Sequence, residues 1–238
     1  RFILNPLASG DAVLTEQERE MGVVVIDIGG GTTDMAIFIE GTVWHTAVIP
    51  VGGDLITNDV THWMHVPFDV AEAVKVHHGH ALQKAVDPLE TFLVEPVGEG
   101  MPIEVQRNAM AEIMEMRVAE MFDMVKKEIK RSGYDGMLRA GAVITGGCAQ
   151  LEGLKEVASR ELGFPVRIAK PERLTGMADA LRAPSYSTSV GLLRMGLSME
   201  TAAVGTRVSS VPGKSIPSPN ISKVIGGLFK RLLPDGDG

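Results

Sequence analysis

The residues best suited to chemistry lie in "DIGGGTTD", where glycines and threonines stand between Asp27 and Asp34. Glycines leave the main chain bare, so consecutive N–H groups can turn inward and bind an anion, while threonine hydroxyls can add donors. A carboxylate at Asp27 suits a Mg²⁺ ion held through water. The alternative is a glycine-rich hairpin that serves only packing. The expected phosphate-binding residues are Gly29, Gly30, Gly31, Thr32 and Thr33.

A second glycine pair, Gly146 and Gly147, lies between the apolar stretch Ala142–Ile144 and a helix expected to begin near Leu151. A single Thr-Gly-Gly step is more typical of a turn. Two strand–glycine loops in one chain, however, favour a shared cleft, with phosphate at one loop and the rest of a nucleotide at the other. The sequence has no G-x-x-x-x-G-K-[ST] motif, which excludes a P-loop protein.

Strands and helices alternate along the chain and must position these loops. The alternation predicts an α/β fold. Asp54 is the expected cap of a helix in "GGDLITNDVTHWM", and Gly41 is the expected hairpin turn. The predicted strands are Val23–Ile28, Met35–Ile39, Thr42–Val51, two short ones within 91–105, and Pro165–Ala169. The predicted helices are 6–20, the one containing Asp54, 67–77, Gln106–Arg131 and 184–198.

Composition bounds the class of protein. The 238 residues are 45% apolar and 22% charged, as in soluble globular proteins. The formal charge of −7 argues against a nucleic-acid partner, which favours a basic stripe. Cys148 is the only cysteine, so no internal disulfide can form and a reducing compartment fits best. The first residue is Arg1, from which we expect the chain to be the later part of a longer protein.

Several motifs resemble a known superfamily. "DIGGGTTD" resembles the second phosphate motif of the actin/Hsp70/sugar-kinase ATPases, "VITGGCAQLEGL" their adenosine motif and "RAPSYSTSVGLL" their second connecting helix. Within that superfamily, "PLASGDAVLTEQERE", "IPVGGDLITNDV" and "EIMEMRVAEMF" resemble the FtsA family of bacterial division proteins. Motif order and spacing agree over residues 3–198. The resemblance implies the second lobe of an actin-like (ribonuclease H-like) ATPase: a mixed sheet flanked by helices, a small α+β subdomain and a C-terminal amphipathic helix.

The resemblance also implies a nucleotide site. The glycine–threonine loop would cradle the β and γ phosphates of ATP, with Asp27 near Mg²⁺. Glu72 and Lys75 match a pair that contacts the ribose and adenine, although by themselves they are an i,i+3 salt bridge on a helix. Gly146, Gly147 and Cys148 would line the adenosine. The family usually has glycine at position 148, so this side chain can crowd the nucleoside. The first phosphate motif is absent, so we expect feeble nucleotide binding by these 238 residues alone.

A division into domains follows from the same resemblance. The C-terminal peptide of FtsZ would bind subdomain 2B, with Lys126, Lys127, Lys130 and Arg131 as candidate contacts, and copies of the protein would self-associate into filaments. Since no general base can be named, we expect at most slow ATP hydrolysis. The expected ranges are 1–20 for the end of the first lobe (1A), 21–66 and 138–198 for domain 2A, 67–137 for 2B, 199–220 for a flexible linker and 221–233 for an amphipathic helix.

The C-terminal segment "ISKVIGGLFKRLL" places apolar side chains on one side of a helical wheel and basic ones on the other. At 1.5 Å per residue it reaches about 20 Å, too short to cross a bilayer. The pattern favours a helix lying in the interface of an anionic membrane leaflet. Docking on the protein's own surface or on another protein is the alternative. The expected membrane-binding residues are Ile221, Val224, Ile225, Leu228, Phe229, Lys230, Arg231 and Leu232.

Together these features predict an ATP-binding, actin-like protein. It would tether FtsZ filaments to the cytoplasmic face of the cell membrane at the division site and help to assemble the septum. Two alternatives share the core fold. One is a PilM-like protein of pilus assembly, which would lack the amphipathic tail. The other is a lobe of a sugar or acid kinase, which would need an acidic base facing a substrate pocket.

Overall fold

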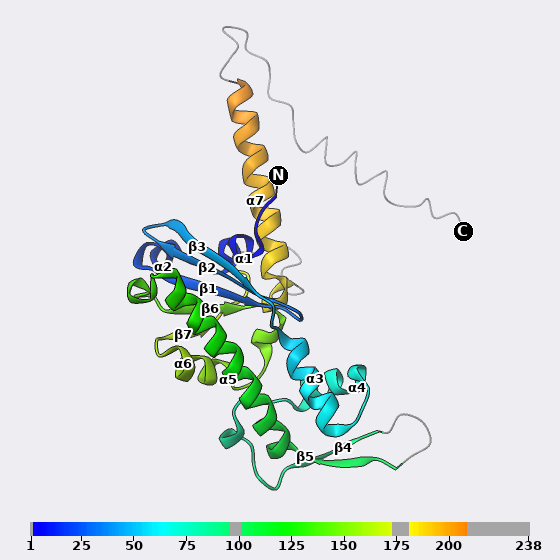
Figure 1. The fold of residues 1–238 in the computed structure, drawn as a ribbon. Coiled ribbons are helices and arrows are strands. Elements are labelled where there is room, and N and C mark those ends of the chain that lie inside the picture. The colour runs from blue at the N-terminus through cyan, green and yellow to red at the C-terminus, as the bar shows by residue number, and fades with distance from the viewer. Residues whose placement is uncertain (1, 96–100, 173–180, 209–238) are drawn as a thin grey trace, which may run out of the picture. The chain divides into compact units, whose positions relative to one another are not determined.

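The structure, a computed structural model, describes residues 2–95, 101–172 and 181–208 (Figure 1). The chain up to Ser198 forms one compact unit, built around a single central sheet. The amphipathic segment 221–233 and most of the predicted linker lie outside the described residues.

Five strands make up the central sheet, in the order β3-β2-β1-β6-β7. The strand β1 pairs antiparallel with β2 and parallel with β6, so the sheet is mixed, as the resemblance implied. The β2–β3 pair is antiparallel and the β6–β7 pair is parallel. The strands are β1 (Val23–Ile28), β2 (Thr33–Ile39), β3 (Thr42–Ile49), β6 (Ala142–Thr145) and β7 (Val166–Ile168).

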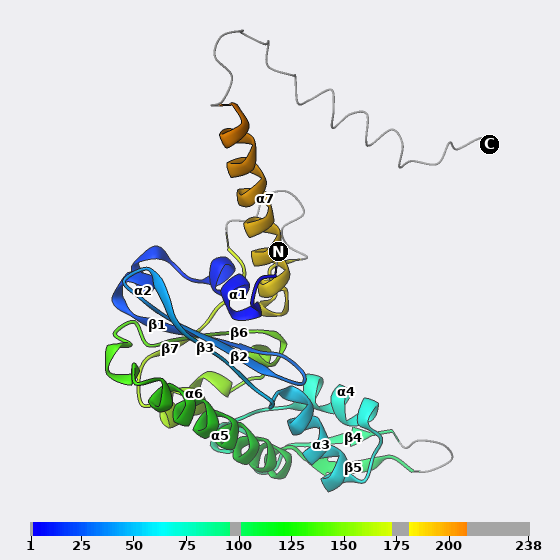
Figure 2. The same ribbon diagram turned by 45° about the horizontal axis from the view of Figure 1, so that its top comes forward.

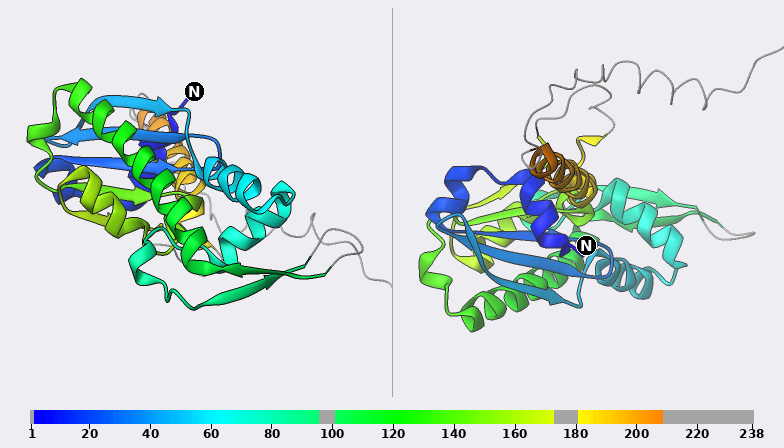
Figure 3. Two further views of the ribbon diagram at one scale, coloured as in Figure 1. Left: turned by 60° about the horizontal axis from the view of Figure 1, so that its bottom comes forward. Right: turned by 90° about the horizontal axis from the view of Figure 1, so that it is seen from above.

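Helices cover both faces of the sheet. Figure 2 shows α1 and the start of α7 on one face and α5 with α6 on the other. Seen from the two directions of Figure 3, α3 and α4 lie beyond one end of the sheet, next to the hairpin β4–β5. The helices are α1 (Asn5–Val13), α2 (Glu16–Met21), α3 (Gly53–Met64), α4 (Phe68–His78), α5 (Arg107–Ser132), α6 (Leu154–Leu162) and α7 (Ser187–Val208), and the hairpin is β4 (Thr91–Val94) with β5 (Ile103–Gln106).

The central strand β1 is buried along its whole length because it faces helices on both sides. Its alternate side chains divide between two cores, since successive side chains of a strand point to opposite faces. Val24 and Ile26 join the larger core with α5 and α6, whereas Val23 and Val25 join a smaller one with α1 and α7. Each such side chain stabilises the fold by about 1.5–3 kcal/mol. The strand therefore holds its C-terminal end, at Asp27 and the glycine loop, in a fixed position.

Three local predictions differ from the structure. The helix predicted over 6–20 is two helices, because a capping box between Thr15 and Glu18 starts α2 afresh. Asp54 does not cap α3: the N-cap is Gly52, and the N–H of Asp54 is satisfied by the carbonyl of Gly30 from another loop. The last helix, predicted over 184–198, continues to Val208. The segment 199–208 contains no proline, and the Ser- and Pro-rich composition begins after it.

Candidate functional site

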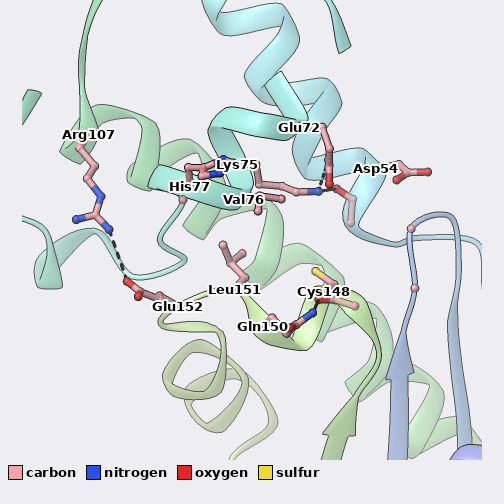
Figure 4. Close-up of a pocket in the computed structure, with 15 residues that line it drawn as sticks. Asp54, Glu72, Lys75, Val76, His77, Arg107, Cys148, Gln150, Leu151 and Glu152 are labelled. Carbon is pink, nitrogen blue, oxygen red and sulfur yellow. Dashed lines mark hydrogen bonds and ion pairs between the residues drawn. The ribbon is translucent and has the colours of Figure 1, made fainter. Parts of the chain in front are cut away.

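A cavity of about 580 Å³ lies where three parts of the chain meet: the loop after β1, the α3–α4 pair and the loop after β6. Figure 4 shows the side chains of α4 on one side of it and those of the loop after β6 on the other. Of the predicted site residues, those that line it are Gly29, Gly30, Glu72, Lys75, Gly147 and Cys148. The structure thus brings together residues from all three predicted motifs.

The loop after β1 is locked against the start of α3. The N–H of Gly29 donates to Thr32 O at 2.9 Å, and the carbonyls of Gly29 and Gly30 accept the N–H groups of Gly53 and Asp54, also at 2.9 Å. Hydrogen bonds between the two loops therefore fix the shape of the glycine turn before any ligand arrives.

The two threonine hydroxyls of this loop are engaged within the protein. Thr32 Oγ1 donates to Asp34 Oδ2 at 2.9 Å, and the buried Thr33 donates to Val51 O at 2.8 Å. Neither residue, nor the exposed Gly31, lines the cavity. A phosphate role for these residues stays a prediction, and for Thr33 it would have to come from the main chain.

Asp27 is 8% exposed at the end of β1, outside the lining of the cavity. Its Oδ2 accepts a hydrogen bond from Thr188 at 2.7 Å. Burial raises the pKa of Asp27 above its ordinary value, against the hydrogen bonds from Thr188 and Ser9, and the neighbouring Asp34 adds to the rise. Among the described residues no group of three or more His, Cys, Asp or Glu side chains could hold a metal ion. The single carboxylate of Asp27 fits a cation that keeps most of its water shell.

Glu72 and Lys75 form a pair on α4 that is tied to α3. Lys75 Nζ lies 2.6 Å from Glu72 Oε2, 2.8 Å from Thr57 Oγ1 and 3.2 Å from Gly53 O. Burial, the largest single influence, raises the pKa of Glu72, but the hydrogen bonds from Lys75 and Thr57 together hold it below its ordinary value. The pair is thus charged, only partly exposed and fixed at the edge of the cavity.

Cys148 and its neighbours form the opposite wall. Gly146 lies so close to β1 that a Cβ there would collide with Ile28 and Asp27. Cys148 lies across from Gly53, since a Cβ on that glycine would be 3.6 Å from the sulfur. Burial raises the pKa of the Cys148 thiol to about 11, with the charge of Lys75 acting in the other direction. The side chain at 148 is therefore a neutral thiol facing Lys75 and Gly53.

The far end of the cavity contains residues that the sequence did not single out. Arg107, at the start of α5, donates from Nε to His78 O at 2.8 Å and from Nη1 to Glu90 Oε1 at 2.9 Å. Its Nη2 lies 3.6 Å from Glu152, which follows the loop after β6 (Figure 4). These contacts join segments far apart in the sequence, so no local pattern could have predicted them.

Comparison with known proteins identifies the family of this chain. The family model "Cell division protein FtsA" matches residues 24–191. The chain belongs to the FtsA family. It is 45% identical over 208 residues to the cell division protein FtsA of Pseudomonas aeruginosa, covering 87% of this chain and 50% of the relative. It is 39% identical over 239 residues to FtsA of Escherichia coli K12, covering 98% of this chain and 54% of the relative. The chain thus spans about half the length of the FtsA relatives it matches.

Solved structures show the actin-like fold. MreB5 of Spiroplasma citri bound to ADP has a TM-score of 0.62 at 18% identity, over 87% of this chain and 61% of that one. A PilM–PilN type IV pilus biogenesis complex has a TM-score of 0.56 at 15% identity, over 76% of this chain and 47% of that chain. PilM therefore shares the fold, whereas the sequence family is FtsA, a family of cell division proteins. No helix among the described residues is long and apolar enough to cross a membrane.

Proposed function

We propose that this FtsA-family chain supplies half of an ATP site and, through its partners, helps to assemble the cell division septum. One observation carries the proposal: the cavity of about 580 Å³ joins the glycine loop, the Glu72–Lys75 pair and the Gly147–Cys148 turn. A nucleotide needs those three environments, namely main-chain donors for phosphate, a polar pair for the ribose and a slot for the base. That the related fold of MreB5 was solved with ADP is consistent with this.

The residues of the chain would divide the work. The bare turn at Gly29–Gly30 lets phosphate oxygens approach the main chain. Glu72 and the stem of Lys75 would orient the sugar and base, and Leu151 with Val76 would exclude water from the base. Asp27 would hold Mg²⁺ through water, and that ion would offset phosphate charge. We assign no general base to this chain, and we propose conformational control of self-assembly into filaments, with slow hydrolysis at most.

Calorimetric titration with MgATP tests the site, on the complete natural polypeptide and on the present 238 residues. We expect micromolar binding by the former and much weaker binding by the latter. Lys75→Met should weaken binding to the complete protein at least tenfold, whereas Lys127→Met, on the exposed side of α5, should not. No binding by the complete protein would refute the proposal.

We also propose that the protein binds the C-terminal peptide of FtsZ. Three of the four predicted contacts on the last turns of α5 have partners within the protein: Lys126 donates to Glu161 O at 2.5 Å, Lys127 lies 2.7 Å from Asp123, and Arg131 lies 2.8 Å from Glu128. Another candidate is a hollow of about 440 Å³ between α3 and α5, which offers apolar surface at Trp63, Ile113 and Met116. Arg117 beside them is itself paired with Asp59 and Glu120. Met116 is 62% exposed.

The third part of the proposal is membrane tethering by the segment 221–233. Its support is the pattern of the sequence, in which apolar and basic residues divide between two sides of a helix. Co-sedimentation with anionic vesicles tests it. Replacing Phe229 and Leu232 together by Glu should release the protein, whereas Ser215→Glu with Ser218→Glu in the preceding segment should not. Unchanged co-sedimentation of the first variant would refute tethering by this segment.

A further inference from the structure

Thr57 lies at the centre of the hydrogen-bond network that joins the two halves of the candidate nucleotide site. It stands on α3, one turn after Gly53, and is fully buried. Its hydroxyl contacts Glu72 Oε2 through a short hydrogen bond, lies 3.2 Å from Gly53 O and accepts from Lys75 Nζ at 2.8 Å. One hydroxyl therefore touches both members of the pair on α4 and the main chain of α3.

The donors and acceptors of this network balance. The ammonium group of Lys75 has three hydrogens, and it has three acceptors: Gly53 O, Thr57 Oγ1 and Glu72 Oε2. The hydroxyl of Thr57 has one hydrogen, which the charged carboxylate of Glu72 takes in preference to a carbonyl because charge-assisted hydrogen bonds are stronger. Removing the hydroxyl would leave one hydrogen of Lys75 and one lone pair of Glu72 without this partner.

The same network continues to the glycine loop. Gly53, whose carbonyl accepts from Lys75 and lies beside the Thr57 hydroxyl, donates its own N–H to Gly29 O at 2.9 Å. Gly53 thus contacts both α4, through its carbonyl, and the loop after β1, through its N–H. Movement of the Glu72–Lys75 pair relative to α3 would therefore displace Gly53 and, through its N–H, Gly29.

We propose that Thr57 is a positioning residue for nucleotide binding. It fixes the charged pair on α4 against α3 and links the nucleoside side of the site to the phosphate side. This role rests on the proposed nucleotide site. Thr57 does not line the cavity and would act only through the groups that do.

The test compares nucleotide affinities of Thr57→Val and Thr57→Ser in the complete natural polypeptide. Valine keeps the volume and branching and removes the hydroxyl, so we expect MgATP affinity to fall about five- to tenfold, as for loss of a hydrogen bond to a charged group. Serine keeps the hydroxyl and should restore most of the affinity. Thr61→Val is the matched control. Thr61 lies one turn further along α3, and its buried hydroxyl has no hydrogen-bond partner among the described residues, so its removal should leave affinity unchanged.

A double variant separates positioning from general loosening. If Thr57 acts through Lys75, then Thr57→Val should cost nothing further in a Lys75→Met background. An equal loss in both backgrounds, or wild-type affinity of Thr57→Val, would overturn the inference. Thermal unfolding without ligand shows whether Thr57→Val folds. If it does not, the MgATP affinities of Thr57→Ser and Thr57→Ala are compared instead, and Thr57→Ala should bind more weakly. Absence of MgATP binding by the wild-type protein would instead refute the proposed function.

Discussion

Gly52 packs so tightly against Gly30 that a Cβ on Gly52 would overlap the carbonyl oxygen of Gly30. The glycines around the site therefore serve two purposes. Those after β1 leave the main chain bare beside the cavity, whereas Gly52 lets a second loop come close enough to hold the first. The N–H groups of the next two residues, Gly53 and Asp54, complete that contact by donating to the glycine turn.

Gly52→Ala should destabilise the protein by about 2–4 kcal/mol, because the new methyl group must push the Gly30 carbonyl away and break both hydrogen bonds. MgATP affinity should fall as well. Urea unfolding measures the first effect. Gly31→Ala is the control, since nothing lies within 4 Å of a Cβ there. Equal stability of the two variants would contradict the interlocking of the two loops.

The crossing of α7 over α1 depends on Gly191 in the same way. A Cβ on Gly191 would overlap the carbonyl of Ala8, so Gly191→Ala should force the helices apart and cost about 2 kcal/mol or more. Gly196 is on the same helix with nothing within 4 Å. Gly196→Ala should stabilise the fold by up to about 1 kcal/mol, because alanine has a higher helix propensity than glycine. Denaturant midpoints of the two variants should move in opposite directions, and a shift in the same direction would argue against a close crossing at Gly191.

The parts of the structure that the sequence predicted are those with a local signal. All residues of Val23–Ile28 except Asp27 are apolar, and three glycines follow, so both the buried strand and the turn were predictable. Thr57 and Arg107 carry no such signal. Thr57 acts on residues 15 and 18 positions away, and Arg107 meets His78, 29 positions away. Asp54 was wrongly predicted as a cap because the helix already begins at Gly53, and the N–H groups of Gly53 and Asp54 donate to Gly29 and Gly30 of another loop. No pattern within one helix reveals that.

We expect an acidic FtsZ peptide bound in the hollow between α3 and α5 to contact Arg117. Arg117 is held there by Asp59, with Nε 2.6 Å from Oδ2. Arg117→Glu should weaken binding of a synthetic FtsZ C-terminal peptide about tenfold or more, because a like charge replaces an attractive one. Trp63 lies in the hollow, so its fluorescence can report binding. Lys127→Glu should have little effect. If Lys127→Glu weakens binding and Arg117→Glu does not, the originally predicted surface on α5 is favoured instead.

Glu18 should make stability depend on pH in the acid range. It accepts from Thr15 N at 2.8 Å and from Arg167 Nε at 2.6 Å. Burial, the largest single influence, raises the pKa of Glu18, yet the hydrogen bonds from Arg167 and Thr15 and the charge of Arg167 together lower it below 4.5. A lowered pKa stabilises the fold at pH values above 4.5, and that stabilisation is lost as the pH falls through the folded-state value.

Glu18→Gln should lower the free energy of unfolding by about 1–3 kcal/mol at pH 7 and remove this pH dependence. Glu16 is exposed in the first turn of α2, so Glu16→Gln should keep the stability of the wild-type protein and its pH dependence. Urea midpoints of the variants between about pH 3 and 7 provide the comparison.

Cys148 offers a direct chemical probe of the cavity, because it is the only cysteine of the chain. The thiolate is the form that reacts with iodoacetamide, and burial raises the pKa of Cys148 from 9.0 to about 11. At about pH 8 the thiolate fraction should therefore be about 100-fold smaller than for an unperturbed thiol, and alkylation slower by a similar factor. A raised pKa stabilises the fold below pH 9.0, and this contribution disappears as the pH rises towards 11. The wild-type protein should thus lose more stability over that range than Cys148→Ala. Unfolding in urea should restore fast alkylation. If the native thiol already reacted at the rate of the unfolded one, Cys148 would not have the raised pKa on which this prediction rests.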